Sequence, residues 1–380
     1  MNTGRKINIT FLASTLPVGG AEHILLELIK HLNRDSFDVN LLCLKAGGSI
    51  GEEFRRMGIR VLDNLMSWRF DASISWRLSS ILKQLKPDVL YMFNHDDAML
   101  WGKVSSRIAG VPVVLLWVHS SFIPGKTFLV RAVNRLTINM VSRIIAISET
   151  HKKSIESNYP ALKENKLEVI YNGLDIDAYD STCANRELSD SLRGQGFEHI
   201  VGTIARLSPE KNLEVLFRAS RIVLDEQPRT LFLVVGDGPE RQRYEGFARE
   251  LGIENNVRFL GMRSDVPSIL KIFDLAVLSS KEEVFPMFLL EAMASRLPVV
   301  STRVGSIEEI VQEGRSGFLV EKGDHRGLAD RILRLINEEE LSREMGNRGR
   351  DIVEQHFTVE RMVTATERLI TDLLRTTTAS

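Results

Sequence analysis

Two glutamates, Glu283 and Glu291, are separated by seven residues, and a helix is predicted to begin between them. Pro286 suits a first helical position, and good helix formers follow it through Ala294. Glu283 would then precede a helix start whose backbone N–H groups have no intrahelical partner, with Glu291 one to two turns into the helix. This arrangement suits a sugar diphosphate, because the N–H groups can bind phosphate and the carboxylates can accept hydrogen bonds from hydroxyls.

Arg206 and Lys211 form a second pair of candidate residues, because both follow a predicted strand and lie five positions apart. Pro209 stiffens the predicted loop between them. Two cations that converge on one diphosphate would stabilise the charge that grows on a leaving group. Arginine can bind phosphate oxygens bidentately, and lysine supplies a point charge. The alternative interpretation is a pair of solvent-exposed surface cations.

Gly19 and Gly20 follow the first predicted strand and begin a helix, where glycine lets the backbone approach a phosphate or a sugar. The sequence is not G-x-G-x-x-G, which argues against a dinucleotide cofactor. A plain tight turn is the alternative. His119 ends an apolar strand, at the edge where a parallel sheet binds ligands. Its alternative role is that of a hydrogen-bonded structural histidine.

Around these residues the chain alternates between predicted strands and helices in two series, which implies an α/β fold with two parallel sheets. The 380 residues also fit two domains. The polar stretch 175–199 has no pattern of a buried strand and is expected to be a linker. A helix is expected over 126–141, and a last one over 359–374. Strands are expected at 7–13, 37–44, 60–62, 89–93, 113–119, 143–147 and 169–171, and then at 200–205, 231–235, 257–260, 275–278, 299–301 and 317–320.

The composition is that of an ordinary globular protein, with 43% hydrophobic and 26% charged residues. The two cysteines, Cys43 and Cys183, indicate no disulfide framework and fit a reducing cytoplasm. The longest apolar run, Val111–Val118, is too short for a membrane span. A cleaved signal peptide is not expected. Residues 98–153 hold eight basic residues and a single acid, which suggests attraction to a polyanion or an anionic membrane surface. A solvated helix face is the alternative.

The segment from Glu283 to Glu291 resembles the signature of retaining glycosyltransferases of family 4, also called group 1 glycosyltransferases. Four further segments resemble that family in the same order along the chain: Gly19–Glu22, the strand ending at His119, Gly202–Asn212 and Val235–Pro239. The resemblance implies the GT-B architecture, in which two Rossmann-like domains face each other across a cleft. The expected domains are an acceptor domain at 1–180, a donor domain at 181–357 and a C-terminal helix at 358–380 that returns to the first domain.

The resemblance also implies roles for particular residues. Glu283, His119, Arg206 and Lys211 are the expected catalytic residues. Glu22 and His95 are expected on the acceptor side. Residues expected to bind the donor are Gly19, Gly20, Gly236, Met262, Arg263, Phe285, Pro286, Met287, Phe288, Leu290 and Glu291.

The resemblance implies a retaining transferase that moves a hexosyl or N-acetylhexosaminyl group from a nucleoside diphosphate sugar, with a UDP-sugar preferred. The expected acceptor is a hydroxyl of a lipid-linked glycan or of a cell-surface polysaccharide precursor. No cofactor, metal or nucleic acid is expected; Asp175 and Asp177 form a D-x-D pattern that is attributed to the inter-domain connection. The expected location is the cytoplasm, with peripheral attachment to the inner face of the membrane. A nucleotide-sugar epimerase of related architecture and a non-catalytic nucleotide-sugar binding subunit remain alternatives.

Overall fold

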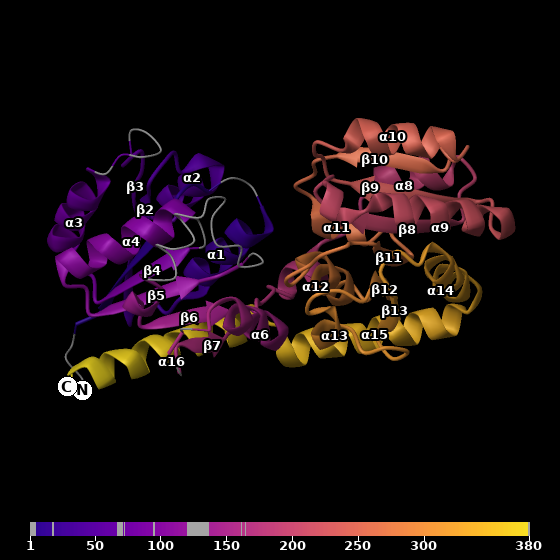
Figure 1. Cartoon of the computed structure of the whole chain (residues 1–380). Coiled ribbons are helices and arrows are strands. Elements are labelled where there is room, and N and C mark those ends of the chain that lie inside the picture. Colours follow the sequence, from indigo (N-terminus) through magenta and orange to yellow (C-terminus); the bar gives the residue numbers. More distant parts are fainter. Residues whose placement is uncertain are drawn as a thin grey trace. The chain divides into compact units, whose positions relative to one another are not determined.

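The structure is a computed structural model that describes residues 5–16, 19–66, 71, 73–93, 96–119, 137–160, 162–163 and 165–378. The chain forms two compact units (Figure 1). The first comprises Met1–Gly173 together with Val359–Ser380, and the second comprises Leu174–Thr358. Two Rossmann-like units were predicted from the sequence, and this prediction is confirmed.

The first unit contains a seven-stranded sheet with the order β3-β2-β1-β4-β5-β6-β7, in which every paired strand is parallel. The central strands are buried on both faces, as their apolar sequences require. Chain order reverses between β1 and β4, which makes this edge a topological switch point. The strands are β1 (Ile7–Ala13), β2 (Phe37–Cys43), β3 (Arg60–Leu62), β4 (Val89–Phe93), β5 (Val113–Trp117), β6 (Arg143–Ala146) and β7 (Leu167–Val169).

Amphipathic helices cover this sheet. α1, for example, buries Ile24, Leu25, Leu28 and Ile29 at helical spacing. The helix expected over 126–141 falls mostly outside the described residues, which resume before a short 3-10 helix, η1. The helical elements of the unit are α1 (Gly20–His31), α2 (Gly48–Arg56), α3 (Ile74–Leu85), α4 (Asp96–Ala109), η1 (Ile138–Met140), α6 (Glu149–Asn158) and α16 (Val359–Thr378).

The C-terminal helix α16 belongs to the first unit, as expected (Figure 1). It contacts α1 and β5. The backbone N–H of Asn33, after α1, donates to Glu367 Oε1 at 2.8 Å, and Met362, Val363 and Ile370 of α16 are buried. Side chains from the two ends of the sequence therefore build one core.

The second unit contains a six-stranded parallel sheet with the order β10-β9-β8-β11-β12-β13. This is the same winding as in the first sheet, and the switch point lies between β8 and β11. The strands are β8 (His199–Ile204), β9 (Thr230–Val235), β10 (Val257–Gly261), β11 (Leu275–Leu278), β12 (Val299–Thr302) and β13 (Gly317–Val320). The helical elements are α7 (Asp177–Ser181), α8 (Arg186–Arg193), η2 (Pro209–Lys211), α9 (Leu213–Glu226), α10 (Arg241–Glu250), α11 (Val266–Leu270), α12 (Met287–Ala294), α13 (Ile307–Ile310), α14 (His325–Asn337) and α15 (Glu339–His356).

The linker predicted at 175–199 is wrong, because this stretch forms α7 and α8 and belongs to the second unit. The units divide between Gly173 and Leu174, earlier than the expected residue 180. Leu174 pairs with Thr358, and its N–H donates to Phe357 O at 2.9 Å. The polar residues that suggested a linker instead cap helices and form ion pairs.

Among the residues that the structure describes, no helix combines the length and the apolar character needed to cross a membrane.

Candidate active site

Lys211 and Glu283 lie together at the switch point of the second sheet. Lys211 ends η2, which follows β8, and Glu283 lies in the loop after the neighbouring strand β11. Lys211 Nζ is 2.6 Å from Glu283 Oε1, and Ser280 Oγ donates to the same oxygen at 2.6 Å. The two charged side chains are 22% and 9% exposed, so water screens this pair less than a surface pair. Two predicted catalytic residues thus form one charged pair at the edge where such sheets bind ligands.

The loop after β12 fixes the backbone around Glu283. Gly305 has φ +57°, and a Cβ there would lie 1.8 Å from the carbonyl oxygen of Glu283. The hydroxyl of Ser306 donates to the carbonyl of Val284, and Thr302 Oγ1 donates to Ser280 O at 2.7 Å. Sequence reasoning did not assign Gly305 or Ser306 to the site. A glycine soon after a strand was the available signal for Gly305.

The basic loop after β8 also packs against glycines. A Cβ at Gly236, which has φ +122°, would lie 2.0 Å from Ala205 O, and one at Gly238 would lie 2.3 Å from Leu207 O. Tyr244 donates its hydroxyl to Ser208 O at 3.1 Å. Gly236, expected to bind the donor, therefore allows two loops of the second unit to approach each other closely.

Arg206 is exposed, and no hydrogen bond or ion pair joins its guanidinium group to another described residue. The positive charge of Arg206 still interacts with the carboxylate of Glu210. Burial raises the pKa of Glu210, but the hydroxyl of Ser208 and the charges of Lys211 and Arg206 leave this pKa below its usual value. These hydrogen bonds and charges together stabilise the ionised form of Glu210.

Glu291 lies on α12 in a mostly buried position. Burial raises the pKa of its carboxyl to about 7, and a hydrogen bond from the hydroxyl of Tyr179 opposes the shift. Pro286 precedes the helix with extended backbone, φ −75° and ψ 106°, so its expected place as the first helical residue is off by one. The N–H of Leu289 donates to Pro286 O at 3.1 Å. The N–H groups of Met287 and Phe288 open the helix and have no partner among the described residues.

The apolar residues of the segment 285–290 mainly pack toward the interior of the second unit. Leu290 is fully buried, Phe288 is nearly so, and the ring of Phe285 meets that of Phe357 at 5.7 Å. Met262 differs, since it is 70% exposed after β10. The neighbouring Arg263, expected with Met262 on the base side of the donor, makes two 2.8 Å hydrogen bonds to Asp265.

At the first switch point, Gly19 and Gly20 begin α1, and Glu22 folds back toward them. A Cβ on Gly19 would lie 2.5 Å from Glu22 Oε2, whereas a Cβ on Gly20 would meet nothing within 4 Å. Burial raises the pKa of Glu22. The backbone of Gly19 is extended, with φ −164°, so the glycine is explained by space for this carboxylate and not by strain.

His119 follows β5 and packs against aromatic rings. Its ring centroid lies 4.2 Å from that of Trp117 and 5.0 Å from that of Phe93. This packing holds the imidazole at the carboxyl edge of the first sheet, as the sequence predicted. His95, the other histidine expected in this unit, lies outside the described residues.

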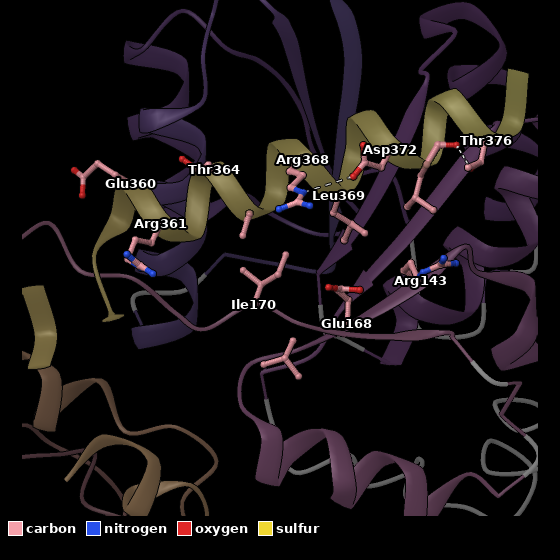
Figure 2. A pocket seen from close by; sticks show the side chains of 13 residues that line it. Arg143, Glu168, Ile170, Glu360, Arg361, Thr364, Arg368, Leu369, Asp372 and Thr376 are labelled. Atoms are coloured by element: carbon pink, nitrogen blue, oxygen red, sulfur yellow. Dashed lines mark hydrogen bonds and ion pairs between the residues drawn. The ribbon is translucent and has the colours of Figure 1, made fainter. Parts of the chain in front are cut away.

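A cavity of about 840 Å³ lies elsewhere on the first unit, between α16 and the strands β6 and β7. Figure 2 shows Arg368 and Asp372 of α16 above Glu168 of β7, with Arg143 of β6 beside them. None of the predicted site residues lines this cavity. Because neither Glu22 nor His119 lines this cavity, we do not assign it as the catalytic site.

The basic stretch 98–153 contributes fewer surface charges than its sequence suggests. Lys103 is buried, and its Nζ is 2.6 Å from Thr137 Oγ1. Burial lowers the pKa of this amine to about 8. Arg107 and Lys153 are exposed. Three further basic residues of the stretch, at 126, 131 and 135, lie outside the described part of the chain.

Comparison with known proteins identifies the family to which the chain is similar. Residues 18–178 match the family described as Glycosyltransferase Family 4, and residues 186–352 match the family described as Glycosyl transferases group 1. The N-acetyl-alpha-D-glucosaminyl L-malate synthase of Bacillus anthracis is 30% identical over 313 residues, which cover 80% of each chain. The UDP-Gal:alpha-D-GlcNAc-diphosphoundecaprenol alpha-1,3-galactosyltransferase of Escherichia coli is 25% identical over 354 residues, covering 90% of this chain and 91% of the relative. Anabaena HepE, solved in complex with UDP, has a TM-score of 0.83 and 26% identity, with 96% of this chain and 100% of HepE covered.

Proposed function

Because this chain belongs to the group 1 glycosyltransferases of family 4, which act on nucleotide sugars, we propose that it is a retaining UDP-sugar transferase. The group transferred is a hexosyl or N-acetylhexosaminyl unit. HepE has been solved with UDP and also with UDP-glucose, which supports a uridine donor. The named substrate of the E. coli galactosyltransferase is a sugar on diphosphoundecaprenol, which supports a lipid-linked glycan acceptor or a related cell-surface polysaccharide precursor.

The observation that carries the proposal is the Lys211–Glu283 pair at the second switch point. A carboxylate here can accept hydrogen bonds from sugar hydroxyls, and the ammonium group can stabilise a departing diphosphate. The open N–H groups of Met287 and Phe288 add donors for phosphate at the start of α12. Glu291, one to two turns further along, offers acceptors to the ribose hydroxyls.

In the proposed reaction, the acceptor oxygen bonds to the anomeric carbon on the face from which the diphosphate leaves. The bond between that carbon and the phosphate oxygen breaks, and its electrons remain on the diphosphate. The acceptor proton passes to the departing phosphate oxygen. Arg206 and Lys211 supply positive charge where a metal ion would otherwise act, so the reaction is proposed to need no metal.

A turnover assay tests the proposal. UDP-glucose, UDP-galactose and UDP-N-acetylglucosamine are each offered with a prenyl-diphosphate-linked sugar, with and without EDTA, and both UDP and product are measured. One donor should give an acceptor-dependent product that keeps the α configuration by NMR, and EDTA should not change the rate. Conversion of a donor without acceptor would indicate an epimerase. Absence of turnover together with absence of UDP binding would reject the donor site.

We also propose contact with an anionic membrane surface through the exposed basic residues of 98–153, such as Arg107 and Lys153. The electrostatic attraction predicts co-sedimentation with vesicles that contain phosphatidylglycerol, and release by salt as the Debye length shortens. Equal binding to vesicles of phosphatidylcholine alone would contradict the proposal.

A further inference from the structure

Arg350 is a charged residue of α15 that lies in the interior of the second unit, and sequence reasoning did not single it out. It is 4% exposed. Its Nε donates to Glu354 Oε1 at 2.5 Å, and Nη2 and Nη1 donate to the carboxylate of Asp180 on α7 at 2.5 Å and 3.1 Å. Nη1 also donates to the carbonyl oxygen of Ala294 on α12 at 2.7 Å. One guanidinium group therefore joins three helices of the unit.

The bond to Ala294 lies at the C-terminal end of α12, because Ala294 is the last residue of that helix. The chain leaves the helix through Arg296, whose φ of +59° is the left-handed conformation typical of helix ends, and its N–H donates to Met293 O at 3.0 Å. Carbonyl groups at a helix end have no intrahelical partner and carry partial negative charge. A buried cation that binds such a carbonyl both satisfies it and holds that end of the helix in place.

Two glycines bring α15 close enough for this contact. A Cβ at Gly346 would lie 2.0 Å from the carbonyl oxygen of Arg296, and one at Gly349 would lie 3.2 Å from Met293 Cγ. Gly346 and Arg350 are four positions apart on α15, so they share one face of that helix. The C-terminal end of α12 is therefore fixed by close backbone packing and by a charged hydrogen bond from the same face.

The other end of α12 is the one proposed to bind phosphate. The N–H groups of Met287 and Phe288 begin the helix, and Glu283, which pairs with Lys211, lies shortly before it. The helix has eight residues and is about 12 Å long, so a shift or tilt at its C-terminal end also displaces the N–H groups at its start. Misplacement by about 1 Å, even from a change far from the chemistry, can cost on the order of 10²-fold in rate.

We propose that Arg350 is a positioning residue for the donor: it fixes the C-terminal end of α12, and so determines where the N–H groups at the start of this helix meet the diphosphate. The inference rests on the proposed function, since it takes the start of α12 as part of the diphosphate site. Arg350 acts through the helix, because its own hydrogen bonds go to Glu354, Asp180 and Ala294.

The test separates phosphate affinity from general stability by comparing UDP with uridine, which lacks the diphosphate. Dissociation constants are measured by calorimetry for UDP and by NMR titration for uridine, together with melting temperatures. Arg350→Met should weaken UDP by about tenfold or more, as for a lost hydrogen bond to a charged group, and leave uridine within about twofold. Arg350→Lys keeps a cation that can reach Ala294 O and should recover part of the UDP affinity.

Val223→Ala is the matched control for lost stability. Val223 is fully buried on α9, in a hydrophobic cluster built from other helices and strands of the second unit than α12. The truncation should lower the melting temperature by several degrees through the cavity that it leaves. The affinities for UDP and for uridine should both stay within about twofold of the wild type.

The outcomes distinguish this inference from the function on which it rests. A wild type that binds UDP no more tightly than uridine would overturn the diphosphate site, and this inference with it. A wild type that prefers UDP, while Arg350→Met keeps the full preference or loses affinity for both ligands alike, would overturn the role of Arg350 alone. If Arg350→Met does not fold, Arg350→Lys decides: a lower melting temperature with an unchanged preference for UDP would also overturn it.

Discussion

The two sheets of this chain have the same winding but carry different charge at their switch points. Each places a mostly buried glutamate on a helix that follows a switch strand, Glu22 on α1 and Glu291 on α12, and burial raises the pKa of both. The second sheet adds Lys211, paired with Glu283. At the first switch point, Glu22 lies beside the backbone of Gly19, where a Cβ would come within 2.5 Å of Glu22 Oε2. The charged pair of the second unit underlies the proposal that the diphosphate binds there and the acceptor hydroxyl binds at the first unit.

The largest effect is expected from breaking the charged pair itself. Glu283→Gln leaves Lys211 without its carboxylate and removes the acceptor proposed for the sugar, so kcat/KM should fall by about 10³-fold. Glu282→Gln is the matched control, because this neighbouring acid is exposed. Steady-state UDP release measures both variants. Equal losses in the two would mean that loop charge in general, and not the pair, supports turnover.

The next effect concerns Glu291 and pH. Its pKa is raised to about 7, so the native state keeps a proton that the unfolded chain releases near the ordinary value of 4.5. The free energy of unfolding should therefore fall as pH rises from about 5 to about 7, by at most about 3 kcal/mol. Glu291→Gln should remove this decline and melt at a higher temperature than the wild type near pH 8. Thermal melts across that range give the comparison, and parallel curves for the two proteins would contradict it.

A smaller effect should distinguish close packing from backbone strain. Gly305 and Gly314 both have positive φ, but only a Cβ at Gly305 would clash with a backbone atom, the carbonyl oxygen of Glu283. Gly314→Ala should cost about 1 kcal/mol of stability through strain alone. Gly305→Ala should cost more and should also lower kcat by displacing Glu283. The melting temperature and turnover of both variants are measured. Equal values would show that the loop moves to accommodate the added methyl group at no extra cost in stability or activity.

The smallest effects belong to the first switch point. Gly20→Ala should leave stability unchanged or raise it by up to about 1 kcal/mol, because the added methyl group meets nothing and alanine favours a helix. Gly19→Ala should displace the flexible carboxylate of Glu22, with a change in melting temperature of only a few degrees. Displacement of the Glu22 carboxylate in Gly19→Ala should also raise the KM for the acceptor. A loss of UDP affinity in Gly20→Ala would instead place phosphate at this turn.

The sequence predicted most of the strands and both parallel sheets, because buried parallel strands are continuous apolar runs and the turns between them carry glycine and proline. It also indicated that Lys211 and Glu283 lie at one edge of the second sheet, because each follows the carboxyl end of a parallel strand. It could not predict α7, because this short polar sequence has no pattern of a buried helix and its contact between Asp180 and Arg350 joins residues far apart along the chain. Gly305 was missed because its close approach to Glu283 depends on tertiary packing.

The affinity of the full-length chain for UDP in two variants tests the central claim most directly. Lys211→Met changes the second switch point, and Glu22→Gln changes the buried carboxylate of the first. Calorimetry without metal should show UDP binding weakened at least about tenfold in Lys211→Met, as expected for loss of a charge-assisted contact, and unchanged within about twofold in Glu22→Gln. Unchanged affinity in Lys211→Met, or an equal loss in both variants, would contradict the assignment of the diphosphate to the second unit.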